Sequence, residues 1–118
     1  MPKPIPLNLN ELEQIANKYN TPYYLYDELS IKMNAINYMN TFKKYFPDFK
    51  QYYAVKALPN PSILNILKKC GMGFDCSSPE EIQIVQLVDF YSDKKSDIMY
   101  TSNYTSKSDL EWVLQNSQ

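Results

Sequence analysis

The sequence predicts an α/β fold built on a small parallel sheet. From residue 27 onward the expected elements alternate as helix, strand, helix, strand, helix, strand, helix. Alternation at this spacing is typical of βα units, whose strands run parallel. The chain has 118 residues, which is enough for one small domain with a core. We find no internal repeat and no low-complexity linker in it.

The first 26 residues are expected to form a lead-in to this unit. A proline-rich segment opens the chain, and Asn8 with Glu11 then predicts the start of a short helix. The apolar face of that helix comprises Leu12, Ile15, Ala16 and Tyr19, and Asn20 follows it. Residues 22–26, Pro-Tyr-Tyr-Leu-Tyr, predict a strand, because proline is tolerated at the first position of a strand.

A long helix is expected from a cap at Asp27 to about Tyr45. Its large apolar side chains recur at steps of three or four, which is the spacing of one helix face. These residues are Leu29, Met33, Ile36, Met39, Phe42 and Phe46. Stripes of this kind usually belong to a core, so this face is predicted to be buried.

Strands are expected at residues 51–56, 73–76 and 98–101, and capping residues predict the helices between and after them. A residue that can accept hydrogen bonds from the first turn precedes each helix: Asn60, Ser78 and Ser106. Glu81, three residues after Ser78, predicts a capping box. Gly71 is placed to end the helix that begins after Asn60.

Overall composition is that of an ordinary globular protein. Hydrophobic residues make up 44% and charged residues 21% of the chain. The net charge of −1 indicates neither nucleic acid nor an anionic membrane as a partner. The sequence has no apolar run of membrane-spanning length and no signal-peptide pattern at its start. A cytoplasmic location is therefore expected.

Scarce residue types restrict the chemistry of these 118 residues. Histidine is absent, all twelve basic residues are lysines, and Gly71 and Gly73 are the only glycines. A histidine general base, an arginine clamp and a glycine-rich phosphate loop are therefore excluded. Cys70 and Cys76 lack the spacing of a redox or zinc site, so both are expected to be reduced and packed, and no metal site is predicted.

Lys56 stands out at the carboxyl end of the first expected strand. Side chains alternate along a strand, so Tyr52, Ala54 and Lys56 are predicted to share one face. Burial of an ammonium group favours the neutral amine, which is the nucleophile that a Schiff base to an aldehyde cofactor requires. The alternative is a lysine that extends to solvent from the strand end.

Several motifs surround Lys56: Tyr52-Tyr53-Ala54-Val55-Lys56-Ala57, Asn60-Pro61, Ile63-Leu64 and residues 71–78, Gly-Met-Gly-Phe-Asp-Cys-Ser-Ser. Together they closely resemble the pyridoxal-phosphate decarboxylases, the family that contains ornithine, arginine and diaminopimelate decarboxylases. Residues 59–61, 75–78 and 97–103 look most like the diaminopimelate branch. The resemblance runs from about residue 21 to near the end of the chain.

This resemblance implies a partial (β/α)8 TIM barrel. Residues 27–118 would be the amino-terminal part of a pyridoxal-phosphate-binding barrel domain, with about three βα units, and residues 1–26 would be the preceding helix and strand. A complete barrel needs eight strands and about 250 residues. The chain is therefore expected to be a fragment, a truncated product or one piece of a split protein. Its sheet is expected to expose an edge and an unclosed inner face.

The resemblance implies pyridoxal 5′-phosphate as the cofactor and Lys56 as the lysine that holds it. Active sites of such barrels lie at the carboxyl ends of the strands, where Lys56 is expected. Asp75 and Glu81 match family positions close to that lysine and are predicted to contribute to cofactor binding. Asp75 could instead be a turn residue, and a capping role alone explains Glu81. Asn103 could line the pocket or belong to a loop.

By the same resemblance the parent protein is a carboxy-lyase of lysine biosynthesis, converting meso-diaminopimelate to L-lysine and CO2, and a homodimer. Ornithine or arginine decarboxylation is an alternative. A second alternative is a truncated, non-catalytic paralogue that binds or regulates a partner. A racemase or a small cofactor carrier is a third, although the racemase motif after the lysine is absent. The family's phosphate loop and other catalytic groups come later in the chain, so this segment alone is expected to be inactive.

Overall fold

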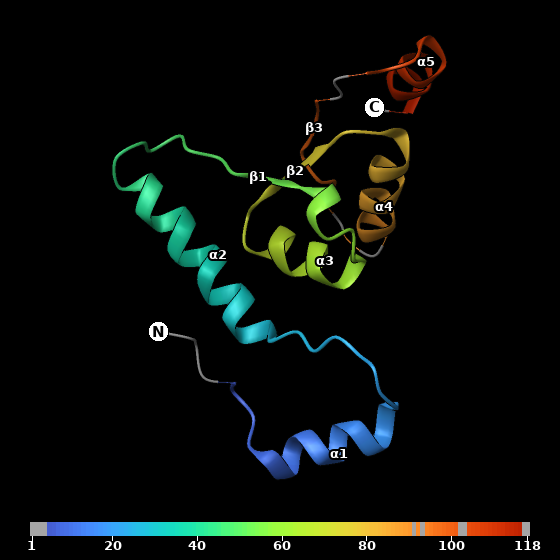
Figure 1. Cartoon of the computed structure of the whole chain (residues 1–118). Coiled ribbons are helices and arrows are strands. Elements are labelled where there is room, and N and C mark those ends of the chain that lie inside the picture. Colours follow the sequence, from blue (N-terminus) through green and yellow to red (C-terminus); the bar gives the residue numbers. More distant parts are fainter. Residues whose placement is uncertain (1–4, 91, 93, 102–103, 117–118) are drawn as a thin grey trace.

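The computed structural model describes residues 5–90, 92, 94–101 and 104–116 (Figure 1). In chain order the elements are α1 (Leu9–Tyr19), α2 (Glu28–Lys43), β1 (Tyr52–Ala54), the short 3-10 helix η1 (Val55–Ala57), α3 (Pro61–Lys69), β2 (Gly73–Cys76), α4 (Pro79–Asp89), β3 (Ile98–Tyr100) and α5 (Lys107–Asn116). Throughout these ranges, every helix is too short or too polar to cross a membrane.

The three strands form one parallel sheet in the order β1–β2–β3. This confirms the predicted α/β class and the βα order. In the register, Ala54 lies opposite Asp75, and Asp75 lies opposite Met99. Among the described residues β1 and β3 each have a single neighbouring strand, so the sheet has two open edges, as expected for an incomplete barrel.

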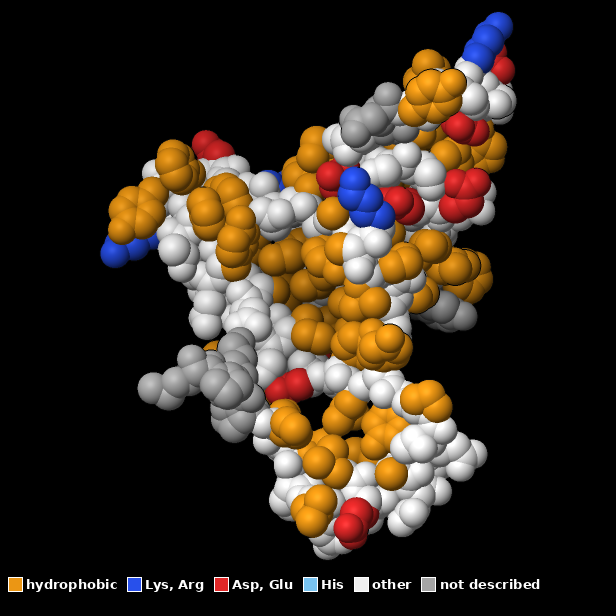
Figure 2. Space-filling view, in the orientation of Figure 1, with side chains coloured by type: hydrophobic (Ala, Val, Ile, Leu, Met, Phe, Trp, Pro, Cys, Tyr) orange, Lys and Arg blue, Asp and Glu red, His pale blue; other side chains and the backbone are white. Residues whose placement is uncertain are grey.

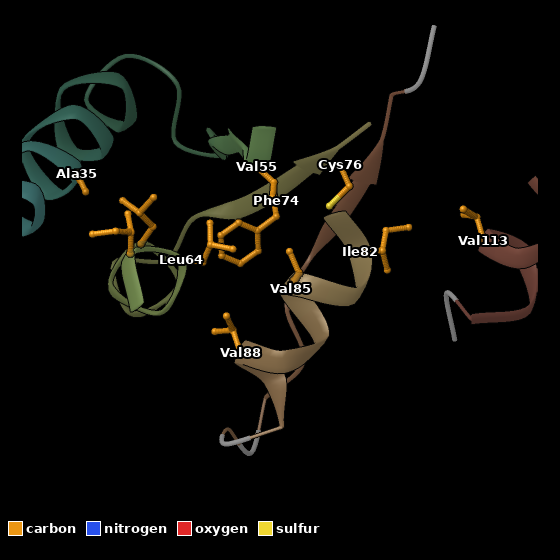
Figure 3. Packing of buried hydrophobic residues seen from close by; sticks show 11 residues of the cluster. Ala35, Val55, Leu64, Phe74, Cys76, Ile82, Val85, Val88 and Val113 are labelled. Atoms are coloured by element: carbon orange, nitrogen blue, oxygen red, sulfur yellow. The ribbon is translucent and has the colours of Figure 1, made fainter. Parts of the chain in front are cut away.

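The core lies on one face of the sheet, against α3 and α4 (Figure 3). Phe74 and Cys76 alternate along β2 onto this face and are fully buried. Leu64 from α3 and Val85 from α4 are also fully buried and pack in the same cluster. Burial of an apolar side chain of this size stabilises the fold by about 1.5–3 kcal/mol. The two helices therefore hold the central strand from one side and leave its other face open.

Gly71 ends α3 as the sequence predicts. Its φ of +88° is a conformation that favours glycine. The Gly71 N–H donates to the Lys68 carbonyl at 2.9 Å, and the Met72 N–H donates to the Leu67 carbonyl at 3.2 Å. This pair of bonds satisfies the last carbonyls of the helix and turns the chain into β2.

The buried face of α2 overlaps the predicted apolar stripe only in part, because Met39 of the stripe is buried and most other stripe residues are not. Met39 and Ala35 are buried, and the small Ala35 side chain joins the core cluster of α3 (Figure 3). The stripe residues Leu29, Met33, Ile36 and Phe46 are exposed. Apolar residues lie on both sides of α2, and contact with α3 decides which side is buried. Figure 2 shows apolar side chains gathered over α3 and beside α2.

The predicted strand at residues 22–26 is wrong. This segment has no regular structure, and the Tyr24 side chain is 90% exposed. A strand needs a neighbour for its N–H and C=O groups, and no described strand runs beside this segment (Figure 1). The α1 helix has the predicted capping box, in which the Asn8 side chain accepts from the Glu11 N–H at 3.0 Å, but buries none of its residues.

The last helix, α5, begins after Ser106 as predicted. The Ser106 hydroxyl accepts from the Asp109 N–H at 3.1 Å. Val113 is buried in the core cluster and Trp112 is partly buried against it, whereas Leu110 and Leu114 are exposed. One side of α5 therefore packs on the rest of the unit.

Candidate functional site

Lys56 lies in the turn that follows β1 rather than in the strand itself. The strand ends at Ala54, and η1 carries Val55 into the core with no exposed surface (Figure 3). Because Val55 points inwards from this turn, Lys56 is directed to the outside, and its side chain is exposed. The expectation of a buried lysine on the strand face is therefore wrong. The amine nevertheless lies at the carboxyl end of β1, the edge at which it was predicted.

Asp75 lies on the open face of the sheet. Its strand neighbours Phe74 and Cys76 point into the core, so alternation directs the Asp75 side chain to the opposite face, where it is half-buried. In the register it stands beside Ala54, two residues before Lys56. One of its carboxylate oxygens, Oδ1, accepts a hydrogen bond from the hydroxyl of Thr101, just after β3. Asp75 is thus a strand residue and not a turn residue.

Glu81 has a local structural role that differs slightly from the predicted capping box. The Ser78 hydroxyl accepts from the Glu81 N–H at 3.4 Å, which is the expected half. The Glu81 carboxylate accepts from the N–H of Ser77 at 2.9 Å rather than from that of the cap residue. This bond still satisfies a backbone donor at the start of α4. It also fixes the carboxylate next to the end of β2.

Cys76 lies between Asp75 and Glu81 in the sequence, and the charges of both acids affect the pKa of its thiol. Burial is the main cause that raises the pKa of its thiol to about 12, and the charges of Glu81 and Asp75 raise it further. The thiol is therefore protonated at neutral pH and is not a nucleophile. Both cysteines are free, as predicted.

The structure brings Asp75, Glu81 and the Lys56 turn to one edge of the sheet, without joining them directly. In the part of the chain that is described, no ion pair connects Lys56 to either acid. Thr101 was missed as a site residue. The available signal was its place at the end of the third predicted strand, where alternation puts it on the same face as Met99. Asn103 lies outside the described residues.

A second group of charged residues lies at the other end of the strands, away from Lys56. Lys68 and Asp89 form an ion pair at 2.7 Å with both side chains mostly buried. Lys50 pairs with Asp97 just before β3. These lysines border a cavity between the end of α3 and the loop before β3. Their partners neutralise them, so we interpret this end as structural.

A parallel sheet covered by helices on one face, with an exposed amine just after its first strand and a carboxylate near the carboxyl end of its second, is the arrangement found in α/β barrel enzymes. Residues 32–118 match the family model described as pyridoxal-dependent decarboxylase, pyridoxal binding domain. The chain belongs to this family, and pyridoxal phosphate is the cofactor of that family.

The relatives are consistent with this membership. Protein TabA of Pseudomonas amygdali pv. tabaci is 42% identical over 104 residues, covering 88% of this chain and 24% of TabA. Diaminopimelate decarboxylase of Methanothermobacter thermautotrophicus is 33% identical over 101 residues, covering 86% of this chain and 23% of that enzyme. The chain thus spans about a quarter of the length of the curated relatives it matches.

A solved structure shares the fold. The crystal structure of Helicobacter pylori diaminopimelate decarboxylase (I148L mutant) complexed with L-lysine superposes with a TM-score of 0.69 and 33% sequence identity. The match covers 88% of this chain and 25% of that one. The three βα units correspond to the amino-terminal part of a barrel decarboxylase, which confirms the predicted partial barrel.

The residues at the carboxyl edge fit one end of pyridoxal phosphate. Lys56 offers an exposed primary amine, the group that bonds to the aldehyde. Ala54 leaves space on the open face, and Asp75 adds a half-buried carboxylate there. The two glycines of the chain, Gly71 and Gly73, lie before and at the start of β2. This segment therefore fits the aldehyde end of the cofactor, not its phosphate.

Proposed function

We propose that this chain is the amino-terminal part of the cofactor-binding barrel of a diaminopimelate decarboxylase, with Lys56 as the residue that bonds the cofactor. One observation carries the proposal: Lys56 is exposed just beyond the carboxyl end of β1, two residues after Ala54, which lies opposite Asp75 in the register. A relative and a solved structure named diaminopimelate decarboxylase, each 33% identical, support the substrate.

The chemistry divides between the cofactor and the chain. When bound, pyridoxal phosphate supplies the electron sink for the charge left on the substrate carbon after CO2 departs. Lys56 would hold the cofactor through Nζ and so fix its position at the carboxyl end of β1. The Asp75 carboxylate would favour positive charge on the open face beside it. The capping role of Glu81 holds the start of α4, which borders the same edge.

The 42% identity to TabA over 104 residues supports a second candidate. At 42% against 33%, this chain is nearer to TabA than to the M. thermautotrophicus enzyme over a similar span. A related protein that shares the cofactor domain and is not a diaminopimelate decarboxylase is therefore the alternative. Release of CO2 from meso-diaminopimelate, L-ornithine and L-arginine by the longer protein that carries this segment separates these candidates. Turnover of meso-diaminopimelate alone supports the first.

Cofactor attachment is tested on the 118-residue chain itself. The protein is mixed with pyridoxal phosphate, reduced with borohydride, and mapped by mass spectrometry. A single adduct at Lys56 that disappears in Lys56→Ala is the expected result. Lys69→Ala is the matched control, because Lys69 is also exposed but lies on α3, away from this edge. Equal labelling of many lysines, unchanged in Lys56→Ala, would overturn the proposal for this chain.

A further inference from the structure

Thr101 continues the sheet by one residue beyond β3. Its backbone N–H donates to the carbonyl of Cys76 at 3.0 Å, which extends the parallel ladder between β2 and β3. Ile98 and Tyr100 pack against the core cluster. Alternation therefore puts Met99 and Thr101 on the other, open face. The position of the Thr101 side chain is thus set by the sheet and not by a loop.

Asp75 faces the same side from the central strand. Its backbone is held between Ala54 and Met99 by the register, so its Cα is fixed. Rotation of the carboxylate about its own bonds is the freedom that remains, and the last torsion of aspartate is broad. The Thr101 hydroxyl donates to Oδ1 of Asp75 and restricts that rotation.

A threonine suits this task better than other hydroxyl residues. Its branched Cβ restricts χ1, so the hydroxyl points in one direction with little further loss of entropy. A hydrogen bond from a hydroxyl to a carboxylate is stronger than one between neutral groups. With Oδ1 engaged, the second oxygen of Asp75 is left for a cation or a donor on the open face.

We propose that Thr101 is a positioning residue, which holds the Asp75 carboxylate in the orientation required for bonding of the cofactor at Lys56. The inference rests on the proposed function. It adds a residue from a third strand to a site otherwise built from the first two, Lys56 after β1 and Asp75 in β2. Thr101 acts through its hydrogen bond to Asp75.

The test uses Thr101→Val, which keeps the shape and removes the hydroxyl, and Thr101→Ser, which restores the hydroxyl. The first readout is the rotamer of Asp75, measured in the free protein by NMR couplings between its α- and β-protons. We expect one rotamer in the wild type, averaging in Thr101→Val and recovery in Thr101→Ser. Averaging in the wild type, or a single rotamer in Thr101→Val, overturns the positioning role without any use of the cofactor.

The second readout is the rate of Lys56 labelling by pyridoxal phosphate, arranged as a double-mutant cycle with Asp75→Asn. Loss of one hydrogen bond to a charged group predicts labelling about tenfold slower in Thr101→Val and nearly normal in Thr101→Ser. Because Thr101 acts through Asp75, adding Thr101→Val to Asp75→Asn should cause no further loss. Equal losses in both backgrounds overturn the inference while the proposed function stands.

Failure of the proposed function itself gives a different pattern. In that case the wild type shows no selective adduct at Lys56, whatever residue stands at 101. Thermal unfolding of each variant is the control for folding. If Thr101→Val labels slowly because it is unfolded at the assay temperature, the result counts against the inference. The slower labelling would then follow from lost stability and not from loss of the hydroxyl.

Discussion

The ring of Tyr52 lies against the α-carbon of Gly73, its partner in the β1–β2 register. A Cβ atom added at Gly73 would stand 2.7 Å from Cδ1 and Cε1 of Tyr52 and 2.9 Å from the carbonyl oxygen of Asp97. That carbonyl also accepts a hydrogen bond from the N–H of Phe74 at 2.8 Å, so it cannot move without weakening the sheet. Close approach of three chain segments therefore requires glycine at this position.

Gly73→Ala should destabilise the fold by about 1–3 kcal/mol, because the added methyl group forces the ring or the strand to shift. Gly71→Ala is the matched control. An added Cβ at Gly71 meets no atom within 4 Å, so the backbone φ of +88° is the one feature that disfavours alanine there. This conformation costs an alanine residue about 1–2 kcal/mol. In a Tyr52→Ala background, the Gly73→Ala loss should shrink and the Gly71→Ala loss should not. Urea unfolding measures both, and unchanged losses would refute the ring contact.

The two cysteines should differ in reactivity. Cys76 is fully buried, and burial with the nearby acids raises the pKa of its thiol to about 12, whereas Cys70 is half-buried. The thiolate is the reactive form. Iodoacetamide at pH 8 should therefore modify Cys70 and leave Cys76 intact until the protein is unfolded in urea. Mass spectrometry of the two peptides checks this, and early modification of Cys76 would contradict its burial.

Features governed by local chemistry could be predicted from the sequence. The caps at Asn60, Ser78 and Ser106 act within one helical turn, and each accepts a backbone hydrogen bond as expected. Gly71 ends α3 through bonds to residues a few positions away. The parallel order followed from the alternation of elements. In each case the residues that decide the outcome are close together in the sequence.

Features that depend on distant residues could not be predicted in this way. The strand expected at 22–26 lacks a pairing partner, and sequence alone does not say which segment would lie beside it. The buried side of α2 depends on contact with α3, since Met39 and Leu29 are both apolar but only Met39 is buried. Thr101 and Asp75 are 26 residues apart, and the register of two strands brings them together. The cofactor roles of Lys56, Asp75 and Glu81 stay predictions.

Cys76 should also affect stability at alkaline pH. The ordinary pKa of its thiol is 9.0, and burial, together with the charges of Glu81 and Asp75, raises this pKa to about 12 in the folded protein. Between these values the folded state keeps a proton that the unfolded state has lost, so stability falls as pH rises, by about 1.4 kcal/mol per pH unit. Cys76→Ala should show a flatter decline than the wild type between pH 9 and 11. Cys70→Ala is the control, and equal slopes in Cys76→Ala and the wild type would contradict the prediction.

Asp89 should make the stability of the fold depend on pH in the acidic range. Burial by itself raises the pKa of this carboxyl, but hydrogen bonds from Lys68 and Ser96 outweigh burial and leave the pKa below its ordinary value of 3.8. The ion pair with Lys68 measures 2.7 Å, and the side chains of Lys68 and Asp89 are 12% and 15% exposed. An acid with a lowered pKa in the folded state stabilises the protein above its unfolded pKa, and this contribution is lost as the pH falls below about 4.

Asp89→Asn should therefore cost about 2 kcal/mol at pH 7, because it leaves Lys68 largely buried without its acid. The gap between the variant and the wild type should narrow as the pH falls towards 3, since protonation of Asp89 removes the same charge in the wild type. Glu28→Gln is the matched control. Glu28 pairs with Lys32, and their side chains are 66% and 44% exposed. This exposed pair should contribute under about 0.5 kcal/mol to stability. Urea unfolding at a series of pH values measures both. A loss in Asp89→Asn that stays constant from pH 7 to 3 would mean that the shape of the side chain, and not its charge, holds the loop before β3 to α4.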